Sequence, residues 1–328
     1  MPQHPDPSRP PPEGQRVCDQ ILQIGCYWGN GGHTELYLLE GDRLALIDTG
    51  VADTPAAYVE PALNAIGRGL ADVEVVINTH GHHDHAGGNR QLHDASGCQI
   101  WIHAADVAIT QDADQQFELF FARNERLLGR EERLPAARQA IAASAGQPAP
   151  IARTFADGDR LDLGRGLELQ VVHTPGHTLG CCTFLWESEG IAISGDSVLG
   201  RGSRVGGMPL IFYPEQYRRA IERVRALRPR ALCLGHHYRT LRQTNESIRS
   251  GDLVDAFLDE SAEIADLIEA ATERAVAAEG RDAPFEPILR RALADLGRAM
   301  PLENEAGADL PNGAVAPISA YWNGLIGR

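Results

Sequence analysis

The sequence predicts an α/β protein built from two β-sheets with helices packed on the outside. Short apolar runs typical of strands alternate with helix-like stretches in both halves of the chain, which is the pattern of this class. Several strand-like runs end in a histidine or an aspartate, so side chains from different strands can meet at one sheet edge. With 328 residues and 43% hydrophobic content, the chain can bury a large core.

The first half of the chain begins with strands. Residues 36–39 and 44–47 form a predicted hairpin around a glycine-aspartate turn. Residues 54–67 have helical spacing, residues 73–78 form an apolar strand, and residues 99–102 form another short strand.

A compositional change follows at residues 104–147, which are rich in Ala, Gln, Glu, Arg and Leu. We expect two or three helices here, inserted between strands as a lid over about residues 104–150. The phenylalanine cluster at residues 117–121 fits either the inner face of that lid, where it would line an apolar substrate, or simple helix packing.

Strand patterns return in the second half of the chain. They cover residues 167–172, 182–186, 191–194 and 231–234, and residues 214–227 between them have helical spacing. The chain is then predicted to be helical from about residue 250 to near residue 300, and the last stretch, with Pro311 and Pro317, to be irregular.

Three regions follow from these patterns. Residues 1–16 are rich in proline and lack the apolar centre of a signal peptide, so we expect a disordered leader. Residues 17–245 form the main domain. Residues 246–328 form a helical region whose acidity fits a solvated helical face or an acidic docking surface.

Composition excludes several functions. The net charge is −15 and the chain contains no lysine, so a P-loop lysine and a Schiff-base lysine are excluded. An acidic chain is also unsuited to nucleic acid, whose phosphates need basic partners. No apolar run approaches the roughly 18 residues of a membrane span. We therefore expect a cytoplasmic protein, in which six cysteines without a CxxC pair stay reduced.

The densest chemical signal lies at residues 79–88, Thr-His-Gly-His-His-Asp-His-Ala-Gly-Gly. Imidazole and carboxylate are the usual protein ligands of zinc and similar ions. His80, His82, Asp84 and His85 all lie on this short loop after a strand, where they can converge on two metals. The alternative is a polar, glycine-rich turn with surface histidines.

Three later strand-like runs end in further potential ligands, which are His177, Asp196 and His236. Three protein ligands for each metal and one shared carboxylate leave room for a bridging water. We therefore expect two divalent cations, Zn²⁺ first, with Mn²⁺ or Fe²⁺ as alternatives. The predicted sets are His80, His82 and His177 for one metal and Asp84, His85 and His236 for the other, with Asp196 between them.

These motifs resemble those of metallo-β-lactamase-superfamily hydrolases. The resemblance is carried by Thr-His80-x-His82-x-Asp84-His85-x-Gly-Gly, Thr-Pro-Gly-His177-Thr, Ser-Gly-Asp196, Gly-His236 and the early segment Leu-Ile-Asp48-Thr-Gly. It implies an αββα sandwich with the dinuclear site at one edge. Asp48 is then a candidate hydrogen-bond partner of a liganding histidine.

The resemblance points to the glyoxalase- and lactonase-like branch of the superfamily. Asp196 resembles the bridging aspartate of that branch, which true β-lactamases typically lack. The run Gly-His236-His237-Tyr238 is similar to the Gly-His-Glu-Tyr segment of hydroxyacylglutathione hydrolases. The basic residues that hold glutathione in those enzymes commonly include lysine, and this chain has none.

Other residues near the motifs have competing interpretations. His83 is predicted to face outward or to support the site, and His237 competes with His236 as a ligand. Tyr213 and Tyr238 are candidate donors to a developing oxyanion, as in superfamily lactonases, or aromatic residues packed in the core.

The predicted activity is hydrolysis of a small thioester, ester or lactone by a hydroxide held between two metals. Asp84 binds metal and orients the nucleophile, and the expected partner is a small acyl substrate. The alternatives are a phosphodiesterase, a mononuclear iron oxygenase similar to sulfur dioxygenases, and a non-enzymatic protein. The sequence leaves the oligomeric state open.

Overall fold

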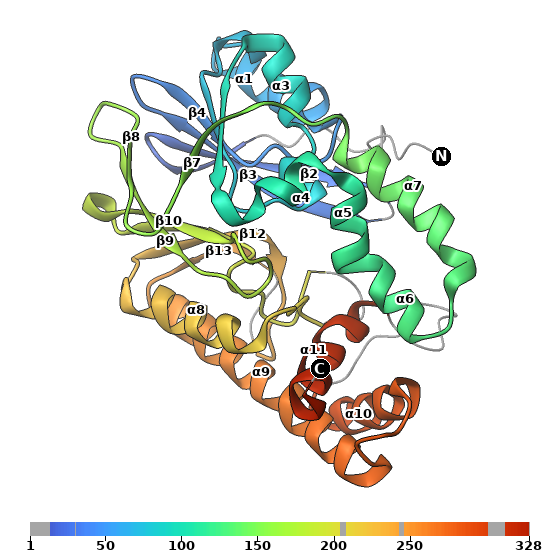
Figure 1. The fold of residues 1–328 in the computed structure, drawn as a ribbon. Helices are drawn as coiled ribbons and strands as arrows, with labels where there is room; N and C mark the ends of the chain where they lie inside the picture. The colour runs from blue at the N-terminus through green and yellow to red at the C-terminus, as the bar shows by residue number, and fades with distance from the viewer. Residues whose placement is uncertain (1–13, 30, 204–207, 243–245, 301–311, 328) are drawn as a thin grey trace.

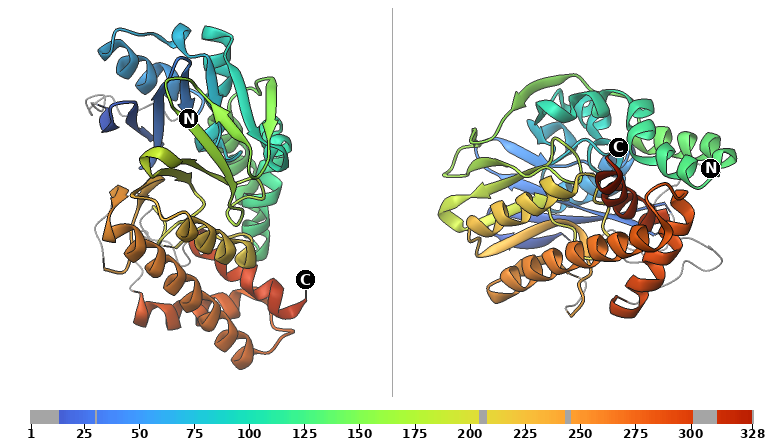
Figure 2. Two further views of the ribbon diagram at one scale, coloured as in Figure 1. Left: turned by 90° about the vertical axis from the view of Figure 1, so that its left-hand side faces the viewer. Right: turned by 60° about the horizontal axis from the view of Figure 1, so that its bottom comes forward.

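The computed structural model describes residues 14–29, 31–203, 208–242, 246–300 and 312–327. Two β-sheets pack face to face, and helices cover the outer face of each sheet (Figure 1). Figure 2 shows the same layers from the side. The predicted α/β sandwich is confirmed.

The first sheet contains seven strands in sequence order. They are β1 (Gln15–Cys18), β2 (Ile21–Trp28), β3 (Gly32–Glu40), β4 (Leu44–Ile47), β5 (Val75–Ile77), β6 (Gln99–His103) and β7 (Ile151–Phe155). Strands β1 to β4 pair antiparallel with one another, and strands β4 to β7 pair parallel. Helices α1 (Glu60–Ala65) and α3 (Asn89–Ser96) lie outside this sheet.

The second sheet contains six strands. In spatial order they are β13 (Glu246–Ser250), β12 (Ala231–Tyr238), β11 (Ile191–Gly195), β10 (Cys182–Trp186), β9 (Glu168–His173) and β8 (Arg160–Asp162). Helix α8 (Pro214–Ala226) connects the parallel strands β11 and β12, as a crossover of this kind requires. Helices α8 and α9 (Asp252–Glu279) cover the outer face.

Strand β3 shows why both faces of a sheet are apolar. Tyr37 and Leu39 point into the core between the sheets, and Leu36 and Leu38 point to the helices on the other face. Alternate residues of a strand point to opposite faces, so a strand covered on both sides needs an almost continuous apolar run.

The segment predicted as a lid is helical and lies between β6 and β7, and its covering role stays a prediction. It contains α4 (Val107–Gln111), α5 (Ala113–Phe117), a π-helical turn (Glu118–Ala122), α6 (Arg123–Leu127) and α7 (Leu134–Ala145). These are four α-helices, where the sequence predicted two or three. Asp112 separates the first two helices because its carboxylate accepts the Asp114 and Gln115 amide hydrogens and so caps α5.

The C-terminal region differs from the prediction at both ends. Residues 246–250 form the edge strand β13 and not a helix. Beyond α10 (Phe285–Ala299), the stretch predicted to be irregular contains α11 (Asn312–Ile326), with Pro317 inside it. A proline costs a helix about 3 kcal/mol, but Ile318 and Trp322 are buried against α9 and α10, and this packing outweighs the local preference.

The N-terminal prediction can be compared only in part. Residues 1–13 of the predicted leader lie outside the described residues. Gln15 and Arg16, its last residues, already belong to β1, where Arg16 pairs with Glu40. In the described part of the chain, no helix is long and apolar enough to cross a membrane.

Candidate metal centre

The histidine-rich loop follows β5 and runs into the short helix α2 (His83–Ala86). Gly81 allows the close packing that buries this loop. A Cβ at Gly81 would lie 2.7 Å from Ile109 Cγ1 and 2.7 Å from Thr110 Oγ1 of the lid. Glycine at this position therefore lets the loop pack closely against these two residues.

The first predicted ligand set converges in space. His80, His82 and His177 are buried, and one ligand atom from each lies within 4.8 Å of the others. His82 Nδ1 lies 2.7 Å from His177 Nε2. No group among the described residues hydrogen-bonds to Nε2 of His80 or of His82.

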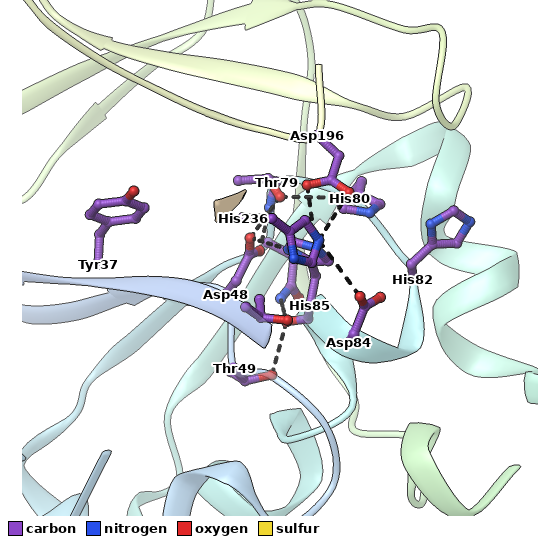
Figure 3. A network of polar contacts seen from close by, with 12 residues as sticks. Tyr37, Asp48, Thr49, Thr79, His80, His82, Asp84, His85, Asp196 and His236 are labelled. Carbon is purple, nitrogen blue, oxygen red and sulfur yellow. Dashed lines mark hydrogen bonds and ion pairs between the residues drawn. The ribbon is translucent and has the colours of Figure 1, made fainter. Parts of the chain in front are cut away.

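The second set, Asp84, His85 and His236, also converges. His236 Nε2 lies 3.1 Å from His85 Nε2 and 3.7 Å from Asp84 Oδ2. Figure 3 shows Asp84 and His85, from the loop, turned towards His236 of β12.

Asp196 lies between the two sets, directly after β11. Its Oδ2 is 3.4 Å from His177 Nε2 of the first set and 3.3 Å from His236 Nε2 of the second. Its Oδ1 is 3.5 Å from His85 Nε2. This carboxylate therefore contacts members of both sets, and Figure 3 shows it directed at His85 and His236.

The charges of these residues fit cations. Burial lowers the pKa of His80 and His82, which favours the neutral imidazole that binds metal. Burial also opposes a proton on His85, but the carboxylates of Asp196 and Asp48 outweigh burial and raise its pKa to about 10. The carboxylates that stabilise a proton at this imidazole would also stabilise a cation in its place. The buried nitrogens without a hydrogen bond and the carboxylates thus suit divalent metal ions.

Hydrogen bonds behind the imidazoles fix their orientation. His85 Nδ1 donates to Asp48 Oδ2 at 2.8 Å, as expected from the sequence, and His177 Nδ1 donates to the Leu210 carbonyl at 2.8 Å. His236 Nδ1 donates to the His33 carbonyl. Each bond leaves Nε2 pointing into the site, the usual arrangement around a metal-binding histidine.

Asp48 is held in place by the ligand loop itself. It accepts hydrogen bonds from the Thr79 amide and the Thr79 hydroxyl, both at 2.7 Å. Its φ of +60° is uncommon for a residue other than glycine and costs roughly 1 kcal/mol. These contacts offset that cost and keep the carboxylate directed at His85.

Asp106 was not predicted, yet its buried carboxylate joins two ligand loops. Its Oδ2 accepts the Gly81 amide hydrogen at 2.9 Å and the Thr178 hydroxyl at 2.6 Å, and its Oδ1 accepts the Gly180 amide hydrogen at 2.7 Å. Gly81 lies between His80 and His82, and Thr178 follows His177. The sequence feature that could have indicated Asp106 is its position shortly after a strand, as for Asp196.

His83 and His237 do not join the two clusters. His83 is buried, so the predicted outward orientation is wrong; its ring contacts Trp28 at 5.6 Å and Phe121 at 5.8 Å between centroids. The ring therefore lies between Trp28 of β2 and Phe121 of the lid. His237 instead contacts Glu35.

The two candidate tyrosines lie in different environments. Tyr238 is buried in the core beneath the second sheet; burial, and then the Asp196 charge, raise its pKa. Tyr213 is half-buried at the start of α8, and burial raises its pKa. The position of Tyr238 fits core packing behind Asp196, and a role for either hydroxyl stays a prediction.

Aromatic side chains cover the first ligand set. Phe120 of the lid and Phe212 contact the His82 ring, with centroids 4.5 and 6.2 Å away. Phe212 also contacts His177 at 5.8 Å. Leu119, from the same predicted cluster as Phe120, is instead 49% exposed.

More than half of the chain matches the sequence model of one protein family. The model of the metallo-beta-lactamase superfamily matches residues 29–236. A hydroxyacylglutathione hydrolase from Rhodospirillum rubrum is 28% identical, covering 81% of this chain and 83% of its own length. A second one, from Jannaschia, is also 28% identical, covering 67% of this chain and 66% of its own length.

Solved structures share the fold. A beta-lactamase domain protein from Burkholderia ambifaria aligns with a TM-score of 0.71 at 18% identity, covering 97% of this chain and 91% of that chain. A metallo-beta-lactamase family protein from Thermus thermophilus aligns with a TM-score of 0.68 at 20% identity, covering 93% of both chains.

Proposed function

Because the chain belongs to the metallo-beta-lactamase superfamily and is a metal-dependent hydrolase, we propose that it uses two divalent cations to cleave a small acyl thioester, ester or lactone. The observation that carries this proposal is the position of Asp196, which contacts histidines of both ligand sets. A carboxylate shared in this way suits a pair of cations better than a single one.

Seven residues would hold the cations, in the two sets already described and with Asp196 common to both. When bound, two such cations lower the pKa of a water molecule so that it acts as a nucleophile near neutral pH. Zn²⁺ suits the nitrogen-rich donor set, and Mn²⁺ or Fe²⁺ are the alternatives.

Asp84 would bind metal and orient the nucleophile. Burial raises the pKa of this carboxyl, but the charges of His85 and then His83 outweigh burial and hold the pKa well below its usual range. Asp84 is therefore ionised at neutral pH, as a metal-binding carboxylate must be. Its side chain is 16% exposed, so it keeps an opening towards substrate.

A thioester is the first choice among acyl substrates. A hydroxyacylglutathione is a thioester, and relatives with that activity in their names match most of this chain. Phe120 and Phe212 would exclude water from one side of the site and contact an apolar acyl group. Glutathione itself is less favoured because the chain has no lysine to hold its carboxylates.

The test is hydrolysis of a panel of thioesters, lactones and phosphodiesters by zinc- and manganese-loaded protein, with metal content measured on the same samples. We expect turnover of a thioester, an ester or a lactone with two cations bound at this centre. A protein purified with one iron and no zinc, and without hydrolysis, would overturn the proposal in favour of an oxygenase. Preferential cleavage of phosphodiesters would overturn the substrate class alone. The cytoplasmic location stays a prediction.

A further inference from the structure

A second histidine-carboxylate cluster lies beside the metal centre. His33 and Glu35 lie two residues apart on β3 and share one face of the strand. His237 reaches them from β12 of the other sheet. His237 Nε2 is 2.7 Å and His33 Nε2 is 3.3 Å from the same oxygen, Oε1 of Glu35.

The cluster combines a buried charge with access to solvent. The Glu35 side chain is 3% exposed, whereas His237 is 38% exposed. An ionised carboxylate at such a depth costs several kcal/mol unless a positive group neutralises it. Two imidazoles directed at one buried oxygen can supply a proton for this purpose, or they can share a cation with it.

The strand opposite leaves space next to these donors. Gly25 of β2 pairs with Glu35 in the register of the sheet. A Cβ at Gly25 would lie 3.3 Å from Glu35 Oε2 and 3.3 Å from His33 Nε2, closer than most side chains tolerate. The absence of a side chain at this position keeps the cluster uncrowded.

We propose that His33, Glu35 and His237 form a third divalent-cation site, distinct from the two-cation centre. One donor atom from each residue lies within 4.8 Å of the others. Two imidazole nitrogens and one carboxylate oxygen are a donor set that zinc and its transition-metal neighbours accept. The inference does not depend on the proposed hydrolase activity.

The distances need little adjustment for a cation. Ligands about 2.0–2.1 Å from a tetrahedral zinc ion lie roughly 3.3 Å apart, which is the separation of His33 Nε2 and Glu35 Oε1. His237, now 2.7 Å from Glu35 Oε1, has to move outward by only about 0.6 Å to reach that separation, and its exposure permits the movement.

An occupied site would hold β3 against β12 next to the main centre. His237 follows His236 in the chain, and His236 Nδ1 donates to the His33 carbonyl. A cation on these three residues therefore supports the strand that carries His236 without contacting the reacting groups.

The experiment counts zinc. Tag-free protein is stripped of metal, loaded with Zn²⁺ and dialysed, and bound zinc per chain is measured. We expect wild type to bind one more equivalent than His237→Gln or Glu35→Gln. His93→Gln, which changes a partly buried histidine on α3, is the matched control and should equal wild type. His177→Ala should lose zinc from the main centre and keep the additional equivalent.

The outcomes separate the alternatives. Equal zinc content in wild type, His237→Gln and Glu35→Gln would overturn the proposal and leave a histidine-glutamate contact without a metal. Circular dichroism shows whether each variant is folded, and His237→Gln, at a partly exposed position, is the safer of the two. If the main centre binds fewer cations than proposed, the difference of one equivalent between wild type and His237→Gln remains measurable.

Discussion

Replacing Asp106 with alanine should weaken metal binding although Asp106 is not one of the proposed ligands. Its carboxylate accepts hydrogen bonds from Gly81 on one ligand loop and from Thr178 and Gly180 on another. The carboxylate thereby fixes the distance between the loop of His80 and His82 and the loop of His177.

The magnitude follows from the donors left behind. Alanine leaves two amide hydrogens and one hydroxyl without their acceptor, and each buried unsatisfied donor costs about 1–3 kcal/mol. Because water can enter the space of the lost carboxylate, we expect a loss of about 3 kcal/mol in the free energy of unfolding. Loss of residues that orient metal ligands typically weakens metal affinity by about 10- to 100-fold.

Asp106→Asn provides a graded comparison. Its one carbonyl oxygen can accept from Gly81 and Thr178, but its amide group faces the Gly180 amide hydrogen, so one donor stays unpaired. We expect about a third of the loss in unfolding free energy seen with alanine. Chemical denaturation and zinc competition with a chelator measure the two effects.

The surface variant Asp94→Ala is the control. It removes an exposed ion pair with Arg90 and should change unfolding free energy by less than about 1 kcal/mol. If Asp106→Ala were as stable as Asp94→Ala and bound zinc as tightly as wild type, the two ligand loops would hold their spacing without Asp106, and the reasoning would be refuted.

Three further predictions concern single side chains. Asp196→Ala should reduce the cations bound at the main centre from two towards one and remove most turnover; full activity with two cations kept at that centre would contradict the shared carboxylate. Burial, and then the charge of His173, lower the pKa of His103 to about 4, below its unfolded value of 6.5. The folded protein favours neutral His103, so the free energy of unfolding should decrease as pH falls from about 6.5 to 4. His103→Asn should make the accompanying decrease in melting temperature smaller. Phe120→Ala should raise KM for apolar acyl thioesters at unchanged metal content; an unchanged KM would indicate helix packing alone.

The ligand loops could be predicted because their signal is local. A strand of apolar residues that ends in histidine or aspartate delivers that side chain to the sheet edge, whatever the rest of the fold does. This is why the predicted ligands meet in space as the sequence suggested, namely His80, His82, Asp84, His85, His177, Asp196 and His236.

Elements that depend on distant packing were missed. Strand β13 contains Ile248 as its one apolar residue, and its Arg249 is buried against the Phe257 ring, with the guanidinium carbon 5.3 Å from the ring centroid. The five residues of β13 do not indicate that helix α9, which follows in the chain, will cover Arg249. The same applies to α11, where Pro317 opposes a helix and burial against α9 and α10 decides the outcome.

The position of the centre between two sheets explains why Asp196 can be shared. The loop residues come from the first sheet, whereas Asp196 and His236 come from neighbouring parallel strands of the second. Parallel neighbours end at the same edge, so one carboxylate and one imidazole arrive together opposite the loop. Gly235 keeps them close to the loop, since a Cβ there would lie 2.4 Å from Asp196 Oδ1 and 2.9 Å from His85 Cε1. Each sheet alone offers an incomplete set of ligands, and a complete centre requires both sheets to be packed together.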